Sequence, residues 1–184
     1  MRIIAGEFRS RRLKTVPGRL VRPTSDRLRE TLFNILGAAV NGAVFVDAYA
    51  GTGAVGLEAL SRGAAQAVFV EESDAALRVL RDNAAALRVQ DRARILESAA
   101  VPALRRLVRE GLAPSVVFLD PPYQEGKEYV SALEAAAAFP GALIVAEHDR
   151  RDRPQGRGLE CHRVLEQGDS ALSFYRAPIP LPCE

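Results

Sequence analysis

Short apolar segments alternate with helical segments along most of this 184-residue chain, and this alternation constrains the fold more than any other feature. The apolar segments predict strands over residues 43–46, 67–70, 94–96, 116–119 and 142–146. The segments between them carry apolar residues at helical spacing and predict helices over residues 54–62, 74–88, 101–109 and 128–138. Strands that alternate with helices of this length form βαβ units, so we expect a parallel sheet.

The C-terminal part of the chain departs from this order. Residues 159–166 and 171–176 predict two strands joined by the turn Gln167-Gly168-Asp169-Ser170, which indicates an antiparallel hairpin. Five strands in βα units followed by a terminal hairpin are the element order of class I S-adenosylmethionine-dependent methyltransferases. We therefore expect an α/β, Rossmann-like fold of that class over residues 42–184, with a mostly parallel sheet and a C-terminal antiparallel hairpin.

Residues 1–41 predict a short basic arm ahead of this domain. Runs at 2–5 and 12–16 suggest a hairpin, and a helix follows that Thr24 or Ser25 caps and Gly37 ends. Residues 1–36 hold nine of the 25 Lys and Arg but three of the 23 Asp and Glu, so their net charge is +6, whereas the remainder carries −4. A polyanionic partner and a solvated segment of an arginine-rich protein explain this charge equally well.

Composition excludes several classes of protein. Hydrophobic residues make up 48% and charged residues 26%, which is typical of a globular domain rather than a disordered chain. Two cysteines and two histidines provide neither a disulfide framework nor zinc-ligand spacing, so we expect no metal. No apolar run approaches the ~20 residues that span a bilayer, and the first residues lack a signal-peptide pattern. We expect a soluble, cytoplasmic monomer without a membrane partner.

A glycine-rich turn follows the first expected strand. The pattern Gly51-x-Gly53-x-x-Gly56 allows backbone to approach a ligand closely, but it also matches the dinucleotide fingerprint. Asp47, four residues before Gly51, favours S-adenosylmethionine, which carries a sulfonium and an ammonium, over a pyrophosphate that a carboxylate would repel. NAD binding and a purely structural tight turn are the alternatives.

Glu71 ends the second expected strand, about 20 residues after Gly51, where a carboxylate can accept hydrogen bonds from ribose hydroxyls. The neighbouring Glu72 is a second candidate for this contact, and either residue could be only a surface acid at a strand end. Given the glycine turn, we expect Glu71 to contact the cofactor together with Asp47, Gly51 and Gly53.

The tetrapeptide Asp120-Pro121-Pro122-Tyr123 follows the fourth expected strand, where two prolines force the chain out of the sheet. The carboxylate of Asp120 and the carbonyl of Pro121 can accept the two hydrogens of an exocyclic amine, and Tyr123 can stack on the base. Asp120 also favours the positive charge that develops on nitrogen. A proline-rich loop whose aspartate caps a helix is the structural alternative, but the preceding glycine turn and strand-end acid favour amino-directed methyl transfer.

This tetrapeptide resembles the Asn/Asp-Pro-Pro-aromatic motif of methyltransferases that act on exocyclic amino nitrogens. The rest of the chain resembles the bacterial 16S rRNA guanine-N2 methyltransferase family that modifies G966. The segments that carry this resemblance are residues 2–6 (RIIAG), 22–34 (RPTSDRLRETLFN), 51–63 (GTGAVGLEALSRG) and 168–172 (GDSAL).

The resemblance implies S-adenosylmethionine as cofactor and a guanine of 16S rRNA as substrate, in the 30S subunit or an assembly intermediate. It implies that Asp120, Pro121 and Tyr123 are catalytic. Many relatives hold adenine with an Asp or Asn after the third strand, but that position is Ala99 here, so Ser98 and backbone groups are expected to replace it.

The arginines of the arm are candidate RNA-binding residues: Arg9, Arg11, Arg12, Arg22, Arg27 and Arg29. Those of residues 22–29 have a second interpretation, in which a buried salt-bridge network with Glu30 holds the arm helix to the body.

Three other functions compete with rRNA methylation. A DNA adenine-N6 methyltransferase uses the same tetrapeptide, but 184 residues leave little room for a target-recognition region. A non-catalytic RNA-binding or ribosome-assembly factor would have no need of Asp120 and the glycines. An NAD-dependent oxidoreductase would leave Asp120-Pro121-Pro122-Tyr123 without a role.

Overall fold

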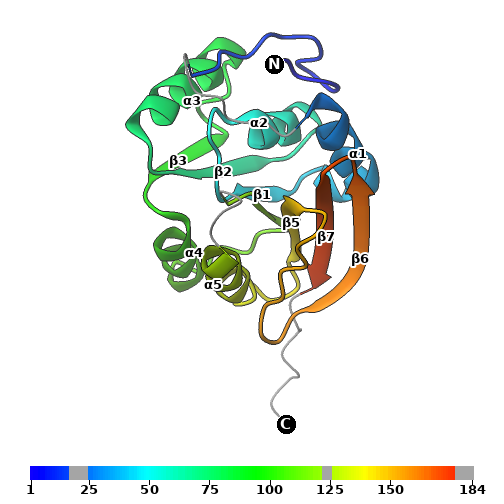
Figure 1. The fold of residues 1–184 in the computed structure, drawn as a ribbon. Helices are drawn as coiled ribbons and strands as arrows, with labels where there is room; N and C mark the ends of the chain where they lie inside the picture. The colour runs from blue at the N-terminus through cyan, green and yellow to red at the C-terminus, as the bar shows by residue number, and fades with distance from the viewer. Residues whose placement is uncertain (17–24, 122–125, 177–184) are drawn as a thin grey trace.

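The computed structural model describes residues 1–16, 25–121 and 126–176, which form one seven-stranded sheet with helices on both faces (Figure 1). The strands are β1 (Val44–Asp47), β2 (Gln66–Glu71), β3 (Ala93–Glu97), β4 (Val116–Leu119), β5 (Leu143–Asp149), β6 (Glu160–Gln167) and β7 (Ser170–Arg176). Their order in the sheet is β3-β2-β1-β4-β5-β7-β6. Strands β1 to β5 are parallel, and β7 is antiparallel to both β5 and β6. The predicted fold class is therefore confirmed, and the position of the hairpin, which the sequence left open, places β6 at the edge.

The helices are α1 (Asp26–Leu36), a 3-10 turn η1 (Gly37–Val40), α2 (Ala54–Ser61), α3 (Asp74–Leu87), α4 (Ala100–Arg109) and α5 (Gly126–Ala136). Helices α1, α2 and α3 cover one face of the sheet, and α4 and α5 cover the other (Figure 1). As predicted, Ser25 caps α1, because its Oγ accepts a hydrogen bond from the Leu28 N–H at 3.1 Å, and Gly37 ends the helix. Thr24 lies outside the described residues.

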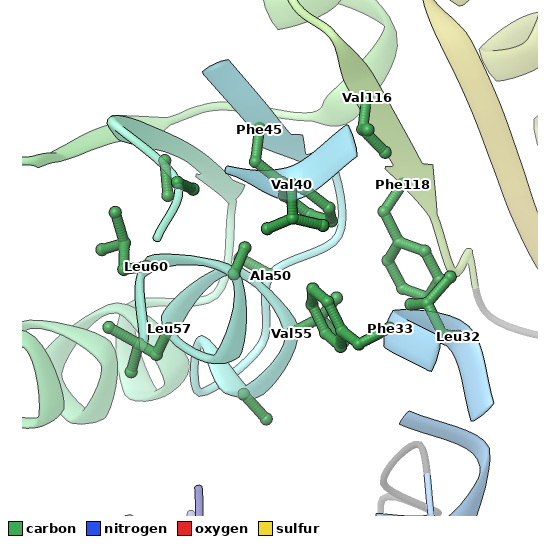
Figure 2. Close-up of a cluster of buried hydrophobic side chains, with 14 of the residues drawn as sticks. Leu32, Phe33, Val40, Phe45, Ala50, Val55, Leu57, Leu60, Val116 and Phe118 are labelled. Carbon is green, nitrogen blue, oxygen red and sulfur yellow. The ribbon is translucent and has the colours of Figure 1, made fainter. Parts of the chain in front are cut away.

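Both faces of the central strands are buried, which explains their continuous apolar runs. In β1, Phe45 faces α1 and α2, whereas Val46 faces α4 and α5. Figure 2 shows the first of these clusters, in which Phe33 of α1 and Val55 of α2 lie near the side chains of β1 and β4. The rings of Phe33 and Phe45 stack with their centroids 6.0 Å apart.

Strand β5 extends three residues beyond the predicted run, which ended at Ala146. The extra residues are polar, but they continue the ladder with β7, where His148 pairs with Ala171. The buried His148 ring has partners for both nitrogens, the Ser173 Oγ and the Asp149 carbonyl oxygen, each at 2.7 Å. Polar residues are therefore compatible with a central strand here because their hydrogen bonds are made inside the sheet.

The two runs of the N-terminal arm pair antiparallel, as the expected hairpin requires, but only over a short length: the Ile3 N–H donates to the Arg11 carbonyl oxygen at 2.9 Å and the Leu13 N–H to the Met1 carbonyl oxygen at 3.1 Å. Only one antiparallel bridge, between Arg2 and Arg12, joins its two runs within the described residues. The arm also contacts the body: Ile3 and Leu13 are buried in the core shared with α1 and α2, and the Lys14 N–H donates to Asn83 of α3 at 2.8 Å. The pairing of the two runs stays short because part of their backbone hydrogen bonding goes to side chains of the helices beneath them.

A buried carboxylate in α2 is the main attachment point of the arm. Glu58 is fully buried, and its two oxygens accept hydrogen bonds from the backbone N–H groups of Ile4 at 2.7 Å and Ala5 at 3.0 Å. The Arg62 Nε donates to the same carboxylate at 2.7 Å, and the Arg29 Nε lies 3.8 Å from it. A carboxylate surrounded by these donors keeps its hydrogen bonds without water.

Arg29 is therefore wrongly predicted as an RNA-binding residue. Its side chain is completely buried and donates hydrogen bonds to the Arg2 carbonyl at 2.6 Å and to Asp26 at 3.0 Å. Burial lowers the pKa of Arg29, and the nearby carboxylates of Glu58 and Asp26 oppose this shift. The alternative interpretation from the sequence, a buried network that holds the arm helix to the body, describes Arg29 correctly, but the acids beside it are Asp26 and Glu58, whereas Glu30 is exposed.

We predict that Glu58→Ala lowers the free energy of unfolding by ~3–5 kcal/mol, because it removes the only fully buried carboxylate beside Arg29 among the described residues and the acceptor of the Ile4 and Ala5 N–H groups. Urea unfolding followed by circular dichroism measures the change. Glu30→Ala on the exposed side of α1 is the control and should stay within ~0.5 kcal/mol of the wild type. A loss below about 1 kcal/mol in Glu58→Ala would show that the arm is held by its apolar contacts instead.

Candidate functional site

The described residues among those predicted to bind the cofactor or to act in catalysis include three acids at one edge of the sheet. Asp47 ends β1, Glu71 ends β2 and Asp120 directly follows β4. In the sheet, β1 lies between β2 and β4, and Asp47 is level with Phe69 on one side and Phe118 on the other. The carboxyl ends of these parallel strands therefore meet, and open α/β sheets bind ligands at that position.

The two glycines of the turn have different roles. Both have positive φ angles, +54° at Gly51 and +85° at Gly53. A Cβ at Gly53 would lie 2.3 Å from the Cδ1 of Leu80 in α3, so a larger residue there would have to displace the Leu80 side chain as well as adopt the positive φ. A Cβ at Gly51 would have no neighbour within 4 Å, so Gly51 marks the open side of the turn, where a ligand can approach the backbone.

Asp47 lies inside the turn rather than on its surface. Its side chain is buried, and Oδ2 accepts a hydrogen bond from the Gly56 N–H of α2 at 2.9 Å. Burial raises the pKa of Asp47 to about 7, and the carboxylate of Glu71 adds to this effect while the Gly56 hydrogen bond opposes it. Asp47 therefore fixes the glycine turn to α2 and presents a carboxyl group whose ionised form a nearby cation would stabilise.

Glu71 faces the glycine turn, and the neighbouring Glu72 is exposed. Oε2 of Glu71 accepts a hydrogen bond from the Gly51 N–H at 2.7 Å, and Oε1 accepts from the Ser73 N–H at 2.8 Å. Of the two acids that the sequence offered, Glu71 is thus the one in position to meet a ligand at Gly51.

Ser98 and Ala99 lie next to this acid, after β3. The Ser98 N–H donates to the Glu71 carbonyl oxygen at 3.1 Å, and Ala99 is the exposed N-cap residue of α4. Ser98 is half-buried and Ala99 is exposed, so burial does not keep a ligand from the Ser98 hydroxyl or from the backbone near Ala99. Whether they hold adenine stays a prediction.

At the end of β4, Asp120 is half-buried and Pro121 is buried. The Pro121 carbonyl oxygen lies 3.3 Å from the Tyr129 hydroxyl of α5, which donates to the Glu147 carbonyl oxygen of β5 at 2.7 Å. Tyr123 and Pro122 lie outside the described residues. Tyr129 is not among the predicted site residues, because its helical spacing from Leu133 marks only a core position.

The arginines of the arm divide into two groups. Arg9, Arg11 and Arg12 are exposed on the arm, and Arg27 is exposed on α1. The Arg11 guanidinium also donates to the Ala86 carbonyl at the end of α3 at 3.0 Å. Arg29 is buried, as described above, and Arg22 lies outside the described residues.

The described residues contain no group of three or more His, Cys, Asp or Glu side chains placed to hold a metal ion. None of the described helices has the length and apolar character of a membrane span.

This strand order and the glycine turn after β1 define the class I methyltransferase fold. The fold matches the structure titled "Putative methyltransferase yhhF from Escherichia coli" with a TM-score of 0.79 and 36% identity, covering 98% of this chain and 99% of that one. It also matches an RNA methyltransferase from Salinibacter ruber in complex with S-adenosyl-L-homocysteine, at a TM-score of 0.66 and 19% identity over 88% of this chain and 97% of that one. At that identity, the second match shows the shared fold alone.

The chain belongs to the family described as "Conserved hypothetical protein 95", whose profile matches residues 1–176. "Putative rRNA methyltransferase YlbH" of Bacillus subtilis is 36% identical over 96% of this chain and 98% of the relative. "Ribosomal RNA small subunit methyltransferase D" of Escherichia coli is 41% identical over 73% of this chain and 67% of the relative. The resemblance inferred from the sequence motifs is thereby confirmed at the level of the family.

We predict that the proton on Asp47 stabilises the folded protein. Its pKa is about 7 in the folded state against an ordinary value of 3.8, so the folded protein binds this proton more tightly than the unfolded chain. This stabilisation is complete below about pH 4 and is lost as the pH rises through 7, at up to ~1.4 kcal/mol per pH unit.

Asp47→Asn keeps an oxygen that can accept from Gly56 but cannot ionise. Urea unfolding of both proteins from pH 4 to 8 should show the wild type losing stability relative to Asp47→Asn as the pH rises. Asp91→Asn, at an exposed aspartate, is the control: it keeps Asp47, so its stability should change with pH in parallel with that of the wild type. Parallel profiles for wild type and Asp47→Asn would contradict the raised pKa.

Proposed function

We propose that this protein transfers a methyl group from S-adenosylmethionine to the exocyclic N2 of a guanine in 16S rRNA, the guanine G966. The observation that carries the proposal is the placement of Asp120 and the Pro121 carbonyl at the end of β4, beside the glycine turn at the end of the adjacent β1. The names of the relatives, which specify rRNA methylation and the small subunit, support the choice of substrate. Such a substrate implies a bacterial cytoplasmic location.

The chemistry of the turn fits the proposed cofactor. When bound, S-adenosylmethionine supplies a methyl group on a positively charged sulfur. The open side of Gly51 admits a ligand to the backbone, and the Glu71 carboxylate beside it can accept hydrogen bonds from ribose hydroxyls. Asp47 adds a second carboxyl group behind the turn, which suits a cation and would disfavour a phosphate.

Asp120 and Pro121 would bind and orient the amine. An exocyclic amino nitrogen is a poor nucleophile because its lone pair is delocalised into the base. The carboxylate and the Pro121 carbonyl together can accept its two N–H hydrogens, which turns the lone pair out of the plane of the base. As the nitrogen becomes positively charged, the negative Asp120 stabilises it in place. Tyr123 would stack on the base and fix its plane.

Methyl transfer should depend on Asp120 and on the ring of Tyr123. Asp120→Ala should abolish transfer while cofactor affinity stays nearly intact, and Asp120→Asn should retain partial activity because its amide oxygen accepts one hydrogen bond. Tyr123→Phe should be mild, whereas Tyr123→Ala should lose ~1–3 kcal/mol of base stacking. The measurement is single-turnover transfer of tritiated methyl groups to unmodified 30S particles at saturating cofactor.

Two results would contradict these roles. Asp120→Ala with more than about a tenth of the wild-type rate, a loss of under ~1.4 kcal/mol, would remove Asp120 from the alignment of the amine. Equal damage from Tyr123→Phe and Tyr123→Ala would assign the role to the hydroxyl instead of the ring. The same assay with 30S particles, naked 16S rRNA and duplex DNA as substrates separates the competing functions. Transfer to DNA adenine, or transfer to none of these three substrates, would overturn the proposed target.

The exposed arginines of the arm are proposed to contact rRNA phosphates. Replacing Arg9, Arg11 and Arg12 by Gln should weaken binding to 30S particles and flatten its salt dependence by ~0.7–0.9 slope units per lost contact. Binding measured between 50 and 200 mM salt tests this. The control replaces three exposed arginines outside the arm, Arg105, Arg109 and Arg157. An unchanged slope in the arm variant, or an equal change in the control, would show that the arm is not the electrostatic anchor.

A further inference from the structure

The first turn of α5 contacts both halves of the proposed site. The buried Tyr129 places its hydroxyl between the ends of β4 and β5, 3.3 Å from the Pro121 carbonyl oxygen and 2.7 Å from the Glu147 carbonyl oxygen. The preceding residue, Glu128, accepts a hydrogen bond from the Tyr49 hydroxyl at 2.6 Å. Tyr49 belongs to the turn after β1, two residues before Gly51. Two consecutive residues of one helix therefore reach the strand end proposed to bind the amine and the turn proposed to bind the cofactor.

The helix makes this a rigid connection. Neighbouring residues of an α-helix point in directions about 100° apart, at 1.5 Å of rise per residue, so their two contacts keep a fixed separation. Helix α5 is itself anchored, because Ala132, Leu133 and Ala136 are buried against the sheet. A shift of the glycine turn relative to Pro121 would thus have to break one of the two contacts or move the helix.

The two distances indicate which carbonyl oxygen accepts the proton of the Tyr129 hydroxyl. A phenol has a single proton to donate, and its nearer acceptor is the Glu147 carbonyl oxygen. The longer approach to Pro121 therefore leaves that carbonyl able to accept a hydrogen bond from an amine, while the hydroxyl limits where the carbonyl can move.

We propose that Glu128 and Tyr129 are positioning residues for methyl transfer. They set the distance between the glycine turn, proposed to bind the cofactor, and the Asp120 and Pro121 groups, proposed to accept the amine hydrogens. The proposal rests on the function proposed above. It places neither side chain in contact with the reacting atoms. Its consequence is kinetic, because a misplacement of about 1 Å between reacting groups can cost a rate factor of about 10² without affecting the binding of either partner.

The first test compares two tyrosine hydroxyls. Tyr129→Phe should lower the single-turnover rate at saturating cofactor and 30S particles by ~10–100-fold, with calorimetric cofactor affinity within ~3-fold of wild type. Tyr175→Phe is the matched control: Tyr175 is buried, and its hydroxyl likewise donates to a backbone carbonyl oxygen, that of Pro154, away from the β4 end. Its rate should stay within ~3-fold. Equal rates for the two variants would overturn the proposal for Tyr129.

The second test is a double-mutant cycle on the Tyr49–Glu128 hydrogen bond. Tyr49→Phe and Glu128→Ala should each slow transfer by a similar factor, and the double variant should be no slower than either, because all three lack the same bond. Glu128→Gln should restore the rate, since its amide oxygen can accept from Tyr49. If the two rate losses multiply in the double variant, the two residues act independently, and the positioning role of their hydrogen bond would be overturned. An inactive wild type on 30S particles would reject the proposed function itself, whereas an active wild type with unaffected variants rejects only the positioning role.

Discussion

Helix α2 is buried along its entire length, and the candidate site depends on that burial. All eight of its residues are buried, and its N-terminal end receives the glycine turn, with Gly53 as the N-cap residue. Asp47 ties the turn to the helix through the Gly56 N–H, and the helix lies so near the sheet that a Cβ at Gly56 would come within 2.3 Å of the Phe69 ring. The turn is thus held between a strand and a helix, neither of which can move without disturbing the core.

A helix without an exposed face needs cover on the side away from the sheet, and the N-terminal arm and α1 provide it. The buried Glu58 carboxylate accepts hydrogen bonds from the arm backbone and from the Arg62 side chain. On the α3 side, the buried Asn83 amide donates to the carbonyl oxygens of both Lys14 in the arm and Thr52 in the glycine turn, at 3.1 and 3.0 Å. The arm is therefore part of the scaffold of the turn as well as a carrier of exposed arginines.

The sequence predicted what depends on local pattern. The apolar runs of the central strands, the helix start at Ser25 and the strand-end residues Asp47, Glu71 and Asp120 all follow from spacing along the chain. It failed where a distant segment determines the environment. Arg29 lies on the polar side of an amphipathic helix and is buried only because the arm covers it, and β5 continues through His148 only because β7 supplies partners. At Gly53, the Leu80 side chain of α3 lies where a Cβ would stand, a contact that spacing along the chain does not reveal.

The charges of the site and of the arm are separated rather than mixed. At the glycine turn, Asp47 and Glu71 place two carboxyl groups close enough that the second raises the pKa of the first beyond the effect of burial. The arm, which lies over α2 and α3, carries exposed guanidinium groups on its outer surface. Exposed charges are screened over about 10 Å at 0.1 M salt, whereas buried ones are screened much less, so the buried acidic turn keeps its own potential. A chain of net charge +2 can in this way offer one face that favours a cation and another that favours a polyanion, which are the charges of the proposed cofactor and of RNA.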